Sequence, residues 1–204
     1  KVAHQVDIIE DGNWKLVMEN NRECYHCDGH PELISAYFPL HGYTAEDVPP
    51  RLRRTWERFD KATAELQAAC VRQGFPLDAI RELDTRPTGF MISHAPLDGA
   101  GKSYTAGGES VCRKRVGSIV DDRFGDMHLH LQPNSWFHML SDHAVVFAAL
   151  PIAPNKTFVR TTWLVHADAV EGVDYDVPTL THVWSATNSQ DSAFVARTQH
   201  QSGG

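Results

Sequence analysis

Residues 19–31, ENNRECYHCDGHP, gather side chains that bind metal ions or transfer protons. The pattern of residues 12–30 favours a helix that carries His26 and His30 one turn apart on its polar face. Two imidazoles at this spacing can bind one ion. Glu23 lies one turn before His26, where a carboxylate can accept a ring proton and so orient a ligating histidine. The residue types and their spacing alone favour a solvent-exposed face that binds nothing.

Three other metal sites can be weighed from the same residues. A zinc knuckle built on Cys24, Cys27 and His30 is disfavoured, because one helical turn cannot aim all of these side chains at one point. The spacings Cys-x-His and Cys-x-x-His also mimic the two halves of a Rieske cluster site, but those halves must lie on separate loops and here they overlap. A zinc hydrolase of the H-E-x-x-H type would need its acid directly after the first histidine, and Asp28 lies one position further on.

Composition narrows the class of protein. The chain has 204 residues, a formal net charge of −7 and 22% charged residues. This charge argues against nucleic acid or an anionic membrane as the main partner. No apolar run approaches the roughly 20 residues needed to cross a bilayer, and the first residues lack the apolar region of a signal peptide. Four cysteines are too few for a disulfide scaffold of this length, so we expect a cytoplasmic protein.

The elements that must position these residues fall into a simple order. Thr44 and Gly74 are placed to cap the two ends of a long charged helix over residues 44–73. A loop-rich region precedes a change to period-two alternation at residue 127. The remaining expected elements are strands over 89–93, 127–133, 143–152 and 157–166, and a helix over 187–200. The sequence therefore predicts an α+β fold in which a helix lies on a curved antiparallel sheet.

The stretch NWKLVMENNRECYHCDGHPEL resembles the iron-binding segment of Rieske-type non-haem iron oxygenases, in the catalytic domain of their large subunit. Four further segments are similar to the branch that oxidises quaternary ammonium compounds such as glycine betaine and stachydrine (proline betaine). They are SYTAGGESVCRKRVG, DHAVVFAALPIAPNKTFVRTTWLVH, WLVHADAVEGVDYDV and VWSATNSQD. The likeness covers nearly the whole chain and implies a helix-grip fold of START/Bet v1 type.

The resemblance also implies roles for individual residues. His26 and His30 match the two iron-binding histidines, and Asp191 matches the carboxylate that completes a 2-His-1-carboxylate site. Glu23 matches the acid that links this site to the Rieske cluster of a neighbouring subunit. Many members separate the two histidines by one residue more than this chain does, which loosens the expected ligand geometry.

On this reading residues 1–204 form the mononuclear iron domain, and neither the N-terminal Rieske domain nor the last C-terminal helix is expected in this chain. The implied cofactors are Fe(II), a Rieske [2Fe–2S] cluster from that other domain, and NAD(P)H acting through a separate reductase. The implied partners are O₂, a small quaternary ammonium substrate, the reductase and two further copies in a bacterial homotrimer.

The implied reaction is the O₂-dependent N-demethylation of a betaine, with choline, carnitine or an aromatic compound as alternative substrates. A quaternary ammonium group is recognised by aromatic faces. The pocket candidates are Trp136, Phe147, Trp163, Trp184 and His130, although packing in the sheet accounts equally well for each aromatic ring. The donor for the betaine carboxylate stays open among His128, His130, His138, Asn134 and Arg160. A helix-grip domain that only binds a ligand is the non-enzymatic alternative.

Overall fold

The computed structural model describes residues 1–22, 26–40, 42–80 and 89–201. Its described strands form one antiparallel sheet in the order β1-β7-β6-β5-β4-β3-β2. The strands are β1 (Val2–Glu10), β2 (Ala79–Ile80), β3 (Phe90–Ala95), β4 (Asp126–Leu131), β5 (Ser135–Met139), β6 (Ala144–Ala153) and β7 (Lys156–Leu164). Every strand from β3 to β7 pairs with its neighbour in sequence, while β1 joins the far edge beside β7. The start of the chain therefore supplies one edge strand of a sheet whose other strands come later in the sequence.

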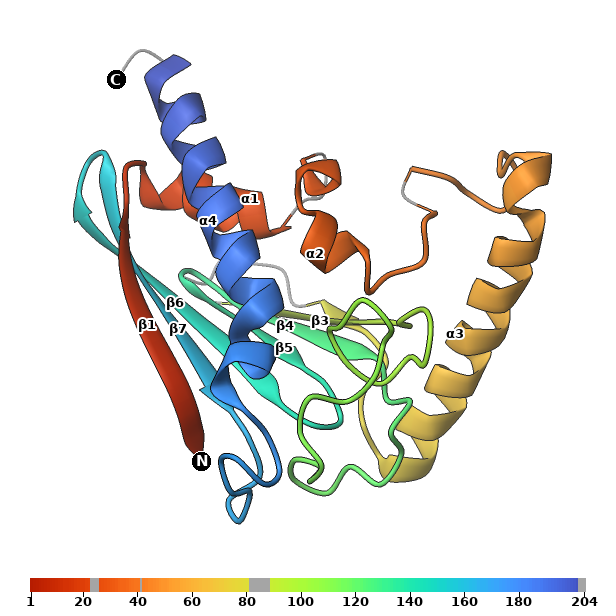
Figure 1. Cartoon of the computed structure of the whole chain (residues 1–204). Helices are drawn as coiled ribbons and strands as arrows, with labels where there is room; N and C mark the ends of the chain where they lie inside the picture. The colour runs from red at the N-terminus through yellow and green to blue at the C-terminus, as the bar shows by residue number, and fades with distance from the viewer. Residues whose placement is uncertain (23–25, 41, 81–88, 202–204) are drawn as a thin grey trace.

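The helices lie on both sides of this sheet. They are α1 (Trp14–Arg22), α2 (Pro31–Ile34), α3 (Arg53–Gln73) and α4 (Val177–Gln201), with short 3-10 helices η1 (Cys27–Gly29) and η2 (Pro50–Leu52). Figure 1 shows α4 lying across one face of the sheet, with α1 and α2 next to it and α3 at the far side of the molecule. The prediction of an α+β fold with a helix laid on a curved sheet is confirmed. No helix in these described ranges is long and apolar enough to cross a membrane.

Burial of alternating side chains explains how the sheet holds two helices. Trp163, Phe147 and Val145 are fully buried on the face that packs against Trp184 of α4. Met127 points to the other side, where it packs with the α3 residue Leu66 and its neighbours. His128 and His130 alternate with Met127 and Leu129, and both face a cavity beneath α4. The alternation in MHLHL therefore predicted which face each side chain takes.

A buried acid fixes the irregular segment between β3 and β4. One carboxylate oxygen of Asp142 accepts hydrogen bonds from the backbone N–H groups of Val111 and Cys112, at 2.7 and 3.3 Å. The other oxygen accepts a hydrogen bond from the Ser103 hydroxyl at 3.0 Å and lies 2.9 Å from Nδ1 of His143. These contacts tie the segment to the turn between β5 and β6. They also hold the neighbouring Tyr104 beside the start of β4, where its hydroxyl donates to Asp126.

Several expected boundaries were wrong. The helix expected over 12–30 ends at Arg22, and residues 27–29 form a tighter 3-10 turn before α2. The helix expected from residue 44 begins at Arg53, because Thr44 and Asp47 cap only an isolated turn and Pro50 starts η2. Its predicted end at Gly74 is confirmed by a φ of 74°, a left-handed conformation that suits glycine. Strands β1, β2 and β5 were not predicted, and α4 begins ten residues before the expected start at 187.

Candidate metal centre and the cavity beside it

The two histidines of the opening motif meet through a turn and not along a helix. His26 precedes η1, and His30 follows it as the residue before α2, where Pro31 takes the first helical position. The backbone N–H of His30 donates to the carbonyl of Cys27 at 2.9 Å, which closes the turn. The ring centroids of His26 and His30 lie 5.0 Å apart with an interplanar angle of 84°. The helical premise was wrong, yet the tighter turn still brings the imidazoles together.

Asp191 of α4 completes the cluster from the other end of the chain. Its Oδ1 atom lies 3.3 Å from Nε2 of His26 and 3.0 Å from Nε2 of His30. The His26 and His30 side chains are 7% and 4% exposed, and that of Asp191 is 20% exposed. The three side chains can each offer one ligand atom, and these atoms lie within 4.8 Å of one another.

The spacing of these atoms fits a bound transition metal. Two ligand atoms bound at right angles, each about 2.1 Å from one ion, lie about 3 Å apart. The contact between His30 and Asp191 has this length but lacks the alignment of a hydrogen bond, so Nε2 of His30 is a buried polar atom that touches a carboxylate and has no hydrogen-bond partner among the described residues. Such an atom costs free energy unless something binds it. Two imidazoles and one carboxylate are the donor set that suits non-haem Fe(II).

Neighbouring polar groups orient these ligands. Nδ1 of His30 lies 2.9 Å from Oε1 of Gln190, so the amide oxygen accepts its proton and leaves Nε2 as the lone-pair nitrogen. Gln190 is held in turn, because its Nε2 donates to Glu32 at 2.8 Å. The side-chain amide of Asn20 donates to Oδ1 of Asp191 at 2.6 Å. Gln190, Glu32 and Asn20 were not among the predicted site residues, although each stands within two residues of a predicted ligand or in the same motif.

The charges in the cluster favour an ionised Asp191. Burial alone would raise the pKa of this carboxyl, but the contacts with His26, His30 and Asn20 hold the pKa below its usual value. The pKa of His30 is raised, chiefly by its contact with Asp191. Behind the cluster, burial raises the pKa of Glu10 to about 7, and the negative charge of Asp191 adds to this effect. Glu10 therefore keeps its proton well above the usual pKa of a glutamate, next to an ionised Asp191.

The cluster opens onto a cavity of about 380 Å³. Residues of α1, α2, β3, β4, β5 and α4 line it. The apolar part of the lining includes Leu33, Ile34, Met91, Ala95 and Trp184, and the polar part includes Asn21, Arg22, Ser93, His128 and His130. The space can admit a small organic molecule next to the side chains of His26, His30 and Asp191.

A buried polar network forms the wall facing the cluster. Asp126, at the start of β4, is fully buried and accepts a hydrogen bond from Tyr37 at 2.6 Å. Tyr104 and His128 contact the same carboxylate oxygen, and Nδ1 of His138 lies 3.2 Å away. Burial opposes ionisation, but His128 and His138 hold the pKa of Asp126 well below its usual value. This group could also supply three metal-ligand atoms, but its carboxylate oxygen is already surrounded by donors.

The predicted pocket residues divide into two groups. His130 and Trp184 line the cavity. Trp136 and Phe147 do not, because they stack on each other with centroids 4.9 Å apart and an interplanar angle of 7° in the core. Trp163 is fully buried on β7 and also lies away from this cavity. Sheet packing accounts for these three rings, as the alternative interpretation of each allowed.

Two candidate carboxylate donors are also placed outside the cavity. Arg160 donates two hydrogen bonds of 2.8 Å to Asp7 on the neighbouring strand β1. Asn134 lies in the turn between β4 and β5, where its carbonyl accepts from Ala149. Glu23 and Cys24 lie outside the described residues, so the predicted bridging acid and the zinc-knuckle alternative are not tested by the geometry.

Comparisons with known proteins find similarity over nearly the whole chain. Residues 1–202 match the family model described as ring hydroxylating alpha subunit (catalytic domain). The chain is 39% identical over 200 residues to the glycine betaine monooxygenase oxygenase subunit of Chromohalobacter salexigens, which covers 98% of this chain and 42% of the relative. It is 41% identical over 201 residues to a Pseudomonas aeruginosa subunit of the same name, with 98% and 44% covered. The chain thus spans less than half the length of these curated relatives.

Two solved structures with a similar fold are crystal structures of the quaternary ammonium Rieske monooxygenase CntA. The one in complex with an inhibitor has a TM-score of 0.56 and 11% identity, covering 100% of this chain and 40% of that one. The one in complex with L-carnitine has a TM-score of 0.52 and 12% identity, covering 100% and 39%. At this level of identity the likeness establishes the fold.

Proposed function

Since this chain belongs to the family of ring-hydroxylating alpha subunit catalytic domains, we propose that it N-demethylates a small quaternary ammonium betaine with O₂ at a mononuclear Fe(II) site. The names of the relatives favour glycine betaine as the substrate, with proline betaine, choline and carnitine as compounds to compare. Residues 1–204 would then be the iron domain of a larger protein.

One observation carries this proposal. Nε2 of His26 and Nε2 of His30 both approach Oδ1 of Asp191, at the edge of a cavity that can hold a small molecule. Bound by these three residues, ferrous iron would supply oxygen activation, since this donor set leaves coordination positions open.

The chain's own residues would prepare the substrate and the ligands. Gln190 would keep His30 in the tautomer that offers Nε2, and Asn20 would hold Asp191. The face of Trp184 would attract the positive trimethylammonium group, which cannot be recognised through an N–H donor. The apolar side chains around it would keep bulk water from the methyl group that reacts.

The overall reaction balances as an N-demethylation. One methyl C–H becomes C–OH, and O₂ with two electrons and two protons supplies this oxygen and one water. The N–CH₂OH product then breaks its C–N bond. Nitrogen keeps the electron pair, and formaldehyde and a proton leave.

The electrons need a source, and this part of the proposal concerns the whole protein. We expect them to pass from NAD(P)H through a separate reductase to a Rieske [2Fe–2S] cluster, and from the cluster of one subunit to the iron of the next in a homotrimer. Glu23 would stand at that junction. This placement follows from its position in the motif before His26.

The test uses the full-length protein with its cluster and a reductase. We expect about one iron per mononuclear site by metal analysis, and one formaldehyde formed per O₂ consumed with glycine betaine. Zinc in place of iron, or no O₂ uptake with any of the four candidate substrates, would overturn the proposal. Tight betaine binding by protein that holds no metal would instead identify a ligand-binding domain.

A further inference from the structure

The positive charge in the described lining of the cavity is concentrated in one side chain. Arg22 is the single arginine or lysine among the described residues that line it. This residue ends α1, and its side chain is exposed, which places it at the cavity mouth. No hydrogen bond or ion pair within the described ranges engages its guanidinium group. A planar guanidinium in this position can bind a carboxylate through two parallel hydrogen bonds.

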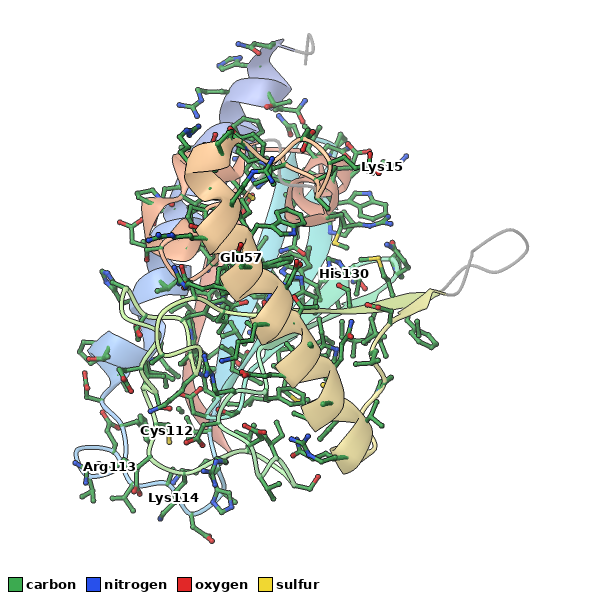
Figure 2. All side chains as sticks on the ribbon, turned by 90° about the vertical axis from the view of Figure 1, so that its right-hand side faces the viewer. Lys15, Glu57, Cys112, Arg113, Lys114 and His130 are labelled. Carbon is green, nitrogen blue, oxygen red and sulfur yellow. The ribbon has the colours of Figure 1, made fainter. Side chains whose placement is uncertain are left out.

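A second polar group lies close to Arg22 inside the cavity. His130 of β4 is 4% exposed, and its Nδ1 atom has no hydrogen-bond partner in the described part of the chain. Figure 2 shows His130 near the middle of the molecule, away from Arg113 and Lys114 at its lower end. Burial lowers the pKa of His130 to about 4, with further lowering from His138, His128 and Arg22. The ring is therefore neutral at pH 7 and can donate one N–H to an anion.

The rest of the cavity suits the opposite end of a zwitterion. Trp184 and Asp191 lie on α4, while His130 lies on the facing strand and Arg22 at the end of α1. The aromatic face and the acid favour a cation on the α4 side. Arg160 is already bound by Asp7 outside the cavity, so Arg22 replaces it as the candidate partner for a carboxylate.

We propose that Arg22 and His130 form a subsite that binds the substrate carboxylate, so that the cavity selects betaines over cations that share their trimethylammonium group but lack an acid. This inference rests on the proposed function and assigns its substrate class. The guanidinium group of Arg22 binds the carboxylate at the cavity entrance, and His130 donates a hydrogen bond to it from inside the cavity. Choline can satisfy neither group, because it carries no anion.

The test measures equilibrium binding to the full-length protein without O₂, so that no turnover occurs. Three probes separate the two ends of the ligand: glycine betaine, choline, and 3,3-dimethylbutanoate, which keeps the shape and the carboxylate without the positive charge. We expect choline to bind about tenfold to a hundredfold more weakly than glycine betaine, the range that one hydrogen bond to a charged group supports.

The variants assign this difference to residues. Arg22→Gln should weaken binding of glycine betaine and of 3,3-dimethylbutanoate by about tenfold or more, and leave choline unchanged. His130→Phe should do the same to a smaller extent, while His130→Gln, which keeps a donor, should recover part of the affinity. Arg160→Gln is the matched control, since it also removes one positive charge, and it should alter none of the three affinities.

Two results would overturn the subsite. One is equal binding of choline and glycine betaine by the wild-type protein; the other is an equal loss of all three probes in Arg22→Gln. Either result could accompany formaldehyde release from glycine betaine, in which case the proposed function stands and the subsite does not. No binding of any probe, together with no formaldehyde, would remove the proposed function instead.

Discussion

Nε2 of His30 lies 3.0 Å from Oδ1 of Asp191, although His30 stands before the short helix α2 and Asp191 stands in the last helix. The contact has the length of two ligands on one ion, and Gln190 holds His30 in the tautomer that a ligand needs. Nearly the whole sheet lies between these residues in the chain. The geometry of the site therefore depends on how α4 packs against α1 and α2.

The first prediction concerns metal content. His26→Ala and Asp191→Ala should each reduce bound iron from about one per site to less than a tenth, because two remaining ligands hold a divalent ion weakly. Metal analysis after dialysis measures this loss. Asp126→Asn is the matched control: it alters the other His/Asp cluster of the same cavity and should retain the iron. If Asp126→Asn loses iron and Asp191→Ala keeps it, the centre lies in the other cluster.

The second prediction concerns orientation of a ligand. Gln190→Leu removes the acceptor for Nδ1 of His30 while nearly preserving side-chain volume. We expect iron affinity to fall by about tenfold to a hundredfold, the usual cost of losing such a contact. Competition with a chelator measures the affinity, and circular dichroism verifies the fold. Gln190→Glu, which keeps an acceptor, should recover most of the affinity. Unchanged iron binding in Gln190→Leu would show that the contact does not orient His30.

The third prediction separates iron binding from electron delivery. Glu23→Gln should keep the iron and lose turnover, because the proposed role of Glu23 is to link two redox centres and not to bind the metal. The reduced full-length protein is mixed rapidly with O₂ and substrate. The rate at which the visible absorption of the oxidised cluster returns then measures electron transfer. Glu19→Gln, in the same motif, is the control and should transfer electrons normally. Normal turnover in Glu23→Gln would remove the bridging role.

The fourth prediction concerns the pH dependence of stability. Glu10 is 4% exposed, and its pKa is raised from 4.5 to about 7, first by burial and then by Asp191. The folded protein keeps this proton in a pH range where the unfolded chain releases it. The contribution of Glu10 to the free energy of unfolding should therefore fall as pH rises from about 4.5 to about 7, and stay low above that.

Glu10→Gln tests this directly in protein freed of metal by a chelator. The variant should match the wild type near pH 4.5 and exceed its free energy of unfolding by up to about 3 kcal/mol at pH 8. Urea unfolding at several pH values measures the free energy of unfolding of both proteins. Contributions of the histidines, which both proteins share, cancel in the difference between the two values. A constant difference across this range would mean that Glu10 does not titrate with a raised pKa.

The sequence predicted the fold class and the faces of the sheet well, because both depend on local periodicity. The alternation of Met127 and His128 predicted that they lie on opposite faces, and the structure shows that His128 lines the cavity while Met127 packs with residues of α3. Strand β1 escaped prediction because it is an edge strand with a largely exposed, mixed pattern. The boundary of α1 escaped because a 3-10 turn and a helix can share the spacing of His26 and His30.

The candidate site was predictable only in part. The histidine pair could be found by spacing, but Asp191 could be added only through resemblance to a family, since no local pattern joins it to His30. Arg22 was missed because its position beside the binding cavity depends on five other elements that form that cavity. The choice among aromatic rings also needed the structure, because Trp136 and Trp184 have the same chemistry and differ only in which neighbours cover them.

The division of the ligands between the two ends of the chain has a consequence for how the protein matures. A ribosome that has released residues 26–30 has made two histidines and no carboxylate partner for them, and α4 is the last described element to emerge. If these three residues bind iron as proposed, tight binding has to wait until synthesis has reached α4 and this helix has docked on the sheet. On the proposed function, metal loading would thus be a late step that follows the docking of the last described helix.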